Sequence, residues 1–215
     1  MAVIFPRWAN RVPGLLALGA VVGAGLAAGG YMALFTPAFT DVGYRPRQPI
    51  PFSHALHSGE LKIDCRYCHA TVEVSTVASL PPTRTCMNCH RLVSRKSEKL
   101  ALLRESDATG QPIHWIRVHK VPEFAYFTHS AHIRAGVGCS SCHGDVSSME
   151  RIEQVKPLGM GWCLDCHRDP ARQLRPRDQI TNTRWTPPRD QERIASRLMT
   201  HASIKPSTDC TTCHR

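Results

Sequence analysis

Apolar residues gather in one long run near the amino terminus. No charged residue lies between Gly14 and Phe35, and Arg7 and Arg11 precede this run of 22 residues. As a helix, the run would be about 33 Å long, enough to cross a hydrocarbon core of about 30 Å. The pattern predicts a membrane anchor within residues 1–40, with its amino terminus in the cytoplasm and the following chain outside.

A cleaved signal peptide is the alternative interpretation of this run. The apolar region of a signal peptide usually has about 7–15 residues and ends at a small-x-small site. Here the bulky residues Tyr31, Met32 and Phe35 follow the small ones, which favours an anchor that is retained. Glycines four residues apart, at positions 19 and 23 and again at 25 and 29, indicate close approach to a neighbouring membrane helix.

The clearest pattern beyond the anchor is an internal duplication. Residues 52–57 read Phe-Ser-His-Ala-Leu-His and residues 127–132 read Phe-Thr-His-Ser-Ala-His, and each segment precedes two Cys-x-x-Cys-His strings. The two repeat units cover about residues 50–95 and 125–170. A fifth string at 210–214 stands as part of a third unit.

All ten cysteines lie in these five strings. The spacing is the signature of covalent c-type haem attachment, in which the two sulfurs bind the porphyrin edge and the adjacent histidine ligates the iron. The haem-attaching cysteines are Cys65 and Cys68, Cys86 and Cys89, Cys139 and Cys142, Cys163 and Cys166, and Cys210 and Cys213. The proximal iron ligands, in the same order, are His69, His90, His143, His167 and His214. We number the strings, and the five haem c groups they predict, I–V along the chain.

Five haems change what the rest of the chain must supply. Macrocycles provide apolar mass, so few conventional core residues are needed, and only 7% of the residues are aromatic. The predicted fold class is a multihaem c-type cytochrome, stapled by its haems, with short α-helices, much irregular structure and one amino-terminal transmembrane helix. Residues 41–215 would form one periplasmic pentahaem domain, in which residues 92–105 predict a short helix ending near Gly110.

The positive charge of the chain has a matching explanation. Lys+Arg of 27 against Asp+Glu of 17 gives +10. Two propionates on each haem would bring roughly ten negative charges, which arginine forks bind well, so no nucleic-acid partner is expected. Residues 168–197 hold eight arginines and no lysine. This segment is either a solvated loop or an extended strap that pairs with propionates or lies across a partner.

Seven histidines lie outside the strings and are candidate ligands for the second axial position of the five irons. Residues i and i+3 of a His-x-x-His pair cannot both reach one iron whose other face is taken, so each pair is predicted to serve two haems. The predicted distal ligands are His54, His57, His119, His129 and His132. His114 and His201 remain as non-ligands, and Met149 or Met160 could replace one histidine and raise that haem's potential. Five irons whose two axial positions are both occupied by side chains favour electron transfer over catalysis at a haem.

Several motifs resemble the pentahaem cytochrome c subunit of bacterial alternative complex III. They are Gln48-Pro49-Ile50-Pro51-Phe52-Ser53-His54, Ile63-Asp64-Cys65-Arg66-Tyr67-Cys68-His69, Cys86-Met87-Asn88-Cys89-His90, Arg117-Val118-His119, Phe127-Thr128-His129-Ser130-Ala131-His132, Met160-Gly161-Trp162-Cys163-Leu164-Asp165-Cys166-His167 and Thr208-Asp209-Cys210. The His-x-x-His motif is also similar to that of tetrahaem class III cytochromes, and by that analogy His54 serves haem I and His129 serves haem III.

The resemblance implies a subunit of a quinol:electron-acceptor oxidoreductase that transfers electrons and is not an enzyme on its own. The implied partners are polytopic quinol-binding membrane subunits, an iron–sulfur subunit, and a monohaem cytochrome c subunit or a soluble periplasmic acceptor. The implied location is the bacterial cytoplasmic (inner) membrane, with a single pass and the haem domain on the periplasmic side. The alternatives are a self-sufficient membrane-anchored multihaem quinol dehydrogenase and a haem-site reductase.

Overall fold

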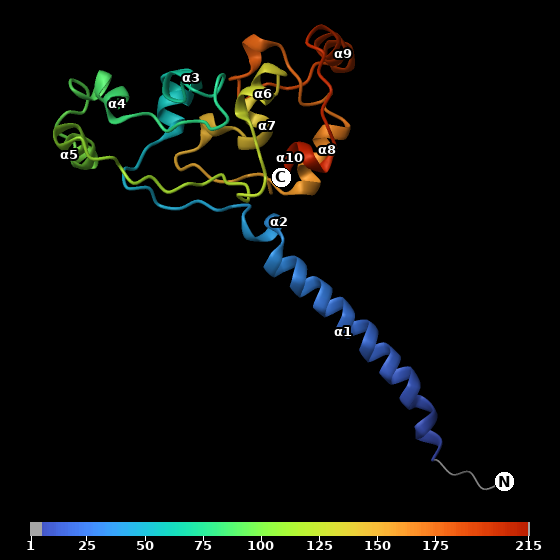
Figure 1. Cartoon of the computed structure of the whole chain (residues 1–215). Coiled ribbons are helices and arrows are strands. Elements are labelled where there is room, and N and C mark those ends of the chain that lie inside the picture. The colour runs from blue at the N-terminus through green and yellow to red at the C-terminus, as the bar shows by residue number, and fades with distance from the viewer. Residues whose placement is uncertain (1–5, 215) are drawn as a thin grey trace.

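One long helix stands apart from a lobe of short helices in the computed structural model, which describes residues 6–214 (Figure 1). A 3-10 turn, Arg7–Arg11, leads into α1, Val12–Phe35. None of the side chains in α1 is buried. The helix ends where Thr36 turns extended and Pro37 follows, because a proline has no amide hydrogen to continue the ladder. The predicted amino-terminal helix is therefore confirmed.

The stretch Trp8–Phe35 is long and apolar enough to cross a membrane. A membrane anchor and a signal sequence share this property, so the helix alone does not separate the two.

The lobe consists of short helices joined by irregular segments, as predicted. Its α-helices are α2 (Pro37–Thr40), α3 (Cys65–Cys68), α4 (Thr83–His90), α5 (Ala101–Thr109), α6 (His129–Arg134), α7 (Cys139–His143), α8 (Met160–Arg168), α9 (Gln191–His201) and α10 (Cys210–Cys213). A π-helical turn, η2 (Ala55–Glu60), and the 3-10 turns η3 (Glu98–Leu100), η4 (Val146–Ser148) and η5 (Arg177–Gln179) complete it. Within residues 6–214 the one β-bridge joins Val137 to Leu174.

The side-chain core of the lobe is small. Among the described residues the buried apolar side chains are Ile50, Val72, Met87, Leu103, Val118, Leu174, Ile180 and Ala195. One small cluster, built on Ile50, Met87 and Leu103, lies beneath α4 and α5. Domains of this size normally bury most of their apolar surface, so the lobe depends on apolar mass that its side chains do not supply.

Two segments differ from their predictions. The helix predicted from residue 92 begins only at Ala101. Residues 91–96 form turns with Ser94 in the left-handed region, and Leu92 is exposed, so no apolar face is buried there. It ends at Thr109, where Gly110 adopts a φ of +71°. The arginine-rich segment 168–197 contains η5 and the start of α9 and is not one extended strap.

Arg175, within that segment, is neither solvated nor free to meet a partner. Its side chain is buried and donates to the hydroxyls of Ser140 and Ser141 in α7 and to the carbonyl of Asn182. The guanidinium also lies 4.5 Å from the centroid of the Trp185 ring. Arg175 therefore fixes the segment against string III.

Candidate haem-binding site

Each Cys-x-x-Cys-His string lies on a helical turn. Strings I, III and V occupy α3, α7 and α10, while strings II and IV occupy the carboxyl-terminal turns of α4 and α8. Residues i and i+3 share one face of a helix, so both sulfurs of a string project to the same side and can reach one porphyrin edge.

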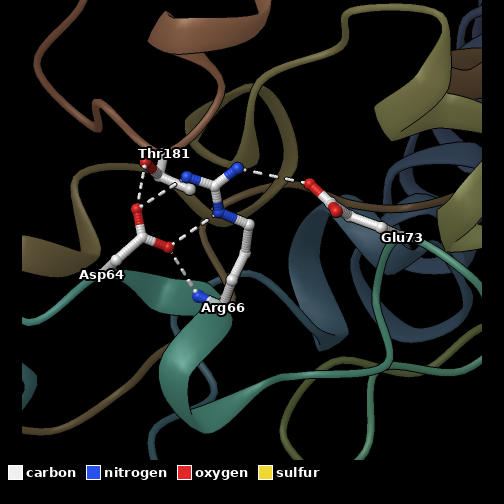
Figure 2. Close-up of polar contacts among 4 residues, drawn as sticks. All are labelled: Asp64, Arg66, Glu73 and Thr181. Atoms are coloured by element: carbon white, nitrogen blue, oxygen red, sulfur yellow. Dashed lines mark hydrogen bonds and ion pairs between the residues drawn. The ribbon is translucent and has the colours of Figure 1, made fainter.

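String I is fixed by a polar network around its first residue (Figure 2). Asp64 caps α3 by accepting from the amide of Arg66 at 2.8 Å, and it also accepts from the guanidinium of Arg66 at 2.9 and 3.1 Å. Arg66 reaches Glu73 at 3.3 Å, and the Thr181 hydroxyl donates to Asp64 at 3.0 Å. The hydrogen bond from Arg66 lowers the pKa of Asp64 to about 2. An aspartate directly before the first cysteine was a sequence signal for this cap.

String I touches strings II and III. The amide of Asn88 in string II donates to the Tyr67 hydroxyl in string I at 2.9 Å. The pKa of the Cys68 thiol is raised by burial and by the neighbouring Cys86 thiol of string II. On the other side, a hydrogen bond from the Cys139 thiol of string III lowers the pKa of Cys65 to about 7.

Strings III, IV and V continue this contact. Burial and the neighbouring thiols of Cys166 and Cys163 raise the pKa of Cys142 to about 11, which places strings III and IV side by side. Ser207 joins string IV to string V, because its carbonyl lies 2.6 Å from Nδ1 of His167 and its hydroxyl lies 2.9 Å from the Thr212 hydroxyl.

The strings therefore follow one another in the order II, I, III, IV, V, which differs from their order along the chain. Figure 1 shows the same arrangement, with α4 at one end of the lobe, α3 and α7 in the middle, and α8 and α10 at the other end. We call this arrangement the haem row.

Seven of the ten predicted axial histidines place Nδ1 2.6–3.2 Å from a main-chain carbonyl. The pairs are His57 with Ser53, His69 with Ser79, His90 with Val93, His129 with Thr76, His132 with Thr128, His167 with Ser207 and His214 with Phe124. A carbonyl can only accept, so Nδ1 carries the proton and Nε2 keeps a free lone pair, as in metal-ligating histidines. His114 and His201 are exposed and have no such bond among the described residues.

Three pairs of rings have the spacing that a shared iron requires. The ring centroids of His57 and His90 are 6.2 Å apart, those of His129 and His143 are 6.4 Å apart, and those of His132 and His167 are 6.1 Å apart. Two imidazoles on opposite faces of one metal, each bound at about 2 Å, have centroids about 6 Å apart. His129 and His132 lie on α6 and reach strings III and IV, while His57 on η2 reaches string II.

The remaining predicted ligands, His54, His119 and His143, are also largely buried. Burial and the neighbouring imidazoles of His69, His57 and His119 lower the pKa of His54 to about 4. Burial also lowers the pKa of His119 to about 4 and that of His143 to about 3. Nδ1 of His54 and Nε2 of His119 are buried without a hydrogen-bond partner. Buried polar atoms are rarely left unpaired, so these neutral imidazoles fit a group whose iron accepts nitrogen ligands.

The two methionines differ in their surroundings. Met149 is half-buried, follows η4, and accepts a backbone hydrogen bond from Ala55 of η2 at 2.9 Å. Met160 is the first residue of α8, and its side chain is 67% exposed. The exposed Met160 is poorly placed to ligate an iron, whereas Met149 lies next to string III, with its Cε 3.5 Å from where a Cβ on Gly144 would be.

Comparison with known proteins supports the class of protein. Residues 125–215 match the family described as cytochrome c7 and related cytochrome c. Over 108 residues the chain is 32% identical to the multihaem cytochrome c subunit of menaquinone reductase from Nitratidesulfovibrio vulgaris (strain Hildenborough). The match covers 49% of this chain and 50% of the relative, so the chain spans about half the length of the curated relative it matches. Neither description mentions alternative complex III.

The helical lobe, the five strings on helical turns and the two matches agree with one another. The lobe has a cytochrome c7-like multihaem fold, and its five strings fit five covalently bound c-type haems.

Proposed function

We propose that this chain is the electron-transfer subunit of a membrane complex that exchanges electrons with menaquinone. The observation that carries the proposal is the haem row, in which each string touches the next without a gap. A haem iron supplies one-electron chemistry by changing between the ferric and ferrous states. Five such sites in contact suit transfer from one end of the lobe to the other.

In this proposal the side chains hold the irons of haems I–IV in a low-spin state. The histidines of the five strings are the proximal ligands. By ring spacing, His57, His129 and His132 are the distal ligands of haems II, III and IV. His54, whose pKa is lowered by burial and by the neighbouring imidazole of His69, is the distal ligand of haem I. The carbonyl bonds to Nδ1 orient the rings, so little rearrangement accompanies each change of charge.

The two ends of the haem row have different surroundings. The anchor, proposed as residues 1–40, joins the lobe beside string IV, because Pro37 lies within 3.7 Å of where a Cβ on Gly159 would be. The opposite end, after string II, exposes Leu92 to 86% beside Arg91, Arg95 and Lys96, around an open cavity of about 460 Å³. An apolar centre with a basic rim suits a redox partner with acidic groups.

The matched relative and the resemblance suggest opposite directions of transfer. The relative is named a subunit of a menaquinone reductase, which supports flow from a periplasmic donor into the quinone pool. Similarity to alternative complex III supports flow from the quinol to a periplasmic acceptor. The row of haems can carry electrons in either direction, and the other subunits of the complex determine the direction of electron transfer.

The experiment is a native gel of mildly solubilised membranes, stained for haem, with mass spectrometry of the stained band. We expect a large assembly that contains polytopic quinone-binding subunits and an iron–sulfur subunit. The intact mass of this chain should include residues 14–35 together with five haems. A band that holds this chain alone would contradict the proposal and favour a self-sufficient anchored quinol dehydrogenase.

Direction is tested on the same assembly. A menaquinol analogue should reduce the haems if electrons leave the membrane. If they enter it, a reduced periplasmic donor should reduce the haems and then the menaquinone analogue. An assembly whose haems respond to neither partner would contradict a quinone-linked role.

A further inference from the structure

String V differs from strings II, III and IV in the surroundings of its proximal histidine, because no second imidazole faces it. The ring of His214 lies against Phe124, with centroids 5.8 Å apart, and its Nδ1 faces the Phe124 carbonyl at 3.1 Å. All twelve histidines of the chain lie within the described residues, and none of the other eleven has its ring paired with His214.

The five predicted distal histidines are all placed at other strings. Three face the proximal histidines of strings II, III and IV, and His54 neighbours His69 of string I. His119 lies edge-on against His143, with ring centroids 4.3 Å apart. That separation leaves no room for an iron between the two rings. His119 also neighbours His54, so two histidines stand beside the one remaining face of haem I and none beside haem V.

Met149 and Met160, the two methionines predicted as alternative ligands, do not supply a distal ligand for haem V. Met160 is one turn before Cys163 of string IV, and the pKa of Cys163 is raised by burial and by the neighbouring Cys213 of string V, so Met160 belongs to the string next to string V. Met160 is the first residue of α8, and its side chain is 67% exposed. Side chains on a helix lean toward its amino terminus, so that of Met160 points away from Cys163. Met149 is packed where η4 meets η2, next to string III.

We propose that haem V keeps its sixth axial position open to a small exogenous ligand. Water would occupy it at rest, and a strong-field ligand would displace the water: cyanide on the ferric iron, carbon monoxide on the ferrous iron. The chain would then carry four histidine-saturated haems and one ligand-binding haem at the end of the row that holds string V. The inference rests on the five covalent haems and not on the membrane complex, so the two can fail separately.

The test uses the full-length chain purified with its five haems. Electron paramagnetic resonance of the oxidised protein should show one high-spin haem for every four low-spin haems. A cyanide titration should convert that signal to low spin at one equivalent per chain, and carbon monoxide should bind one haem of the reduced protein. Five low-spin haems that bind neither ligand would overturn the proposal.

Two matched variants locate the site. Cys210→Ala with Cys213→Ala removes haem V, and the remaining four haems should lose both the high-spin signal and cyanide binding. Cys86→Ala with Cys89→Ala removes haem II from the opposite end, and the signal should stay. A signal that survives the loss of haem V, or disappears with haem II, would place the open iron elsewhere and overturn the assignment.

Met160→Leu completes the test and remains informative if the haem V variant does not accumulate. An iron–methionine bond gives a weak charge-transfer band in the red. We expect no such band in the wild-type chain and no change in cyanide stoichiometry in Met160→Leu. A red band that Met160→Leu abolishes, together with a new cyanide-binding site, would show that Met160 closes haem V.

Discussion

At the residue scale, the site depends on which nitrogen of each imidazole is left free. A carbonyl near Nδ1 selects the tautomer whose Nε2 can bind a metal, and either a local turn or a distant segment supplies that carbonyl. For His57 and His132 the carbonyl belongs to the residue four positions earlier, so the His-x-x-His turn orients its own second histidine. The sequence shows the histidines, but not this arrangement.

His132→Ala should open the iron of haem IV alone. Its ring is 6.1 Å from that of His167 and reaches no other string, so the chain should keep five attached haems and gain one high-spin haem. His201→Ala, at an exposed histidine, is the control and should change nothing. Haem content and electron paramagnetic resonance of the two variants measure this. Loss of attachment, or an unchanged spectrum in His132→Ala, would contradict the proposed ligand.

The Asp64 network should give a pH-dependent contribution to stability. The folded-state pKa of Asp64 is lowered to about 2, so its contribution is complete above the unfolded value of about 4 and is lost as pH falls toward 2. Because the network is partly exposed, we expect Asp64→Asn to lower stability by no more than about 1 kcal/mol. Thermal melting at pH 6 and pH 2 measures the difference, which should shrink at the lower pH. Glu123→Gln, at an exposed glutamate, should show no such dependence.

At the element scale, the strings are positioned by segments that come from distant parts of the chain. The Ile180 carbonyl accepts from the Cys139 amide at 3.0 Å, and the adjacent Thr181 bonds Asp64, so one short segment holds strings I and III together. Arg175 adds a second clamp on string III. Both elements lie within the arginine-rich segment that composition alone marked as a loop or strap.

Gly138→Ala should disturb this clamp. A Cβ at Gly138 would lie 2.1 Å from the Arg175 guanidinium, which is buried and cannot swing into solvent. Overpacking of this kind costs about 1–3 kcal/mol, and denaturant unfolding of the oxidised protein measures it. Gly161→Ala, inside α8 with no atom within 4 Å of the added methyl, should be neutral or slightly stabilising. Equal effects from the two substitutions would show that Arg175 does not clamp string III.

Much of the fold class could be predicted because its strongest signals are local. Five cysteine pairs beside histidines and one uncharged run in α1 need no tertiary information. The starting point of α5 could not be predicted, because the favourable composition of residues 92–105 has no buried face to pack against until Ala101. The pairing of the histidine rings could not be predicted either, and nor could the contact of His119 with His143. Both depend on tertiary contacts, about which the spacing of residues in the sequence carries no information.

At the scale of the whole molecule, the order of the haem row determines the path. String III stands between the pair II and I and the pair IV and V, so it is the one link between the two halves in the proposed order. The chain folds the third string of the sequence into the centre and leaves the second at one end. A path read in sequence order would instead pass from string II directly to string III.

Removing the central haem should therefore separate the row into two parts. With Cys139→Ala and Cys142→Ala, electrons that enter at haem V should reduce haem IV rapidly and haems I and II only in a separate, much slower phase. Removing haem II with Cys86→Ala and Cys89→Ala should leave the other four haems in one rapid phase. Rapid-mixing absorbance of preparations that retain four haems measures both. A single rapid phase without haem III would contradict the order, because electrons would then have a route between the halves that bypasses the contact of Cys65 with Cys139.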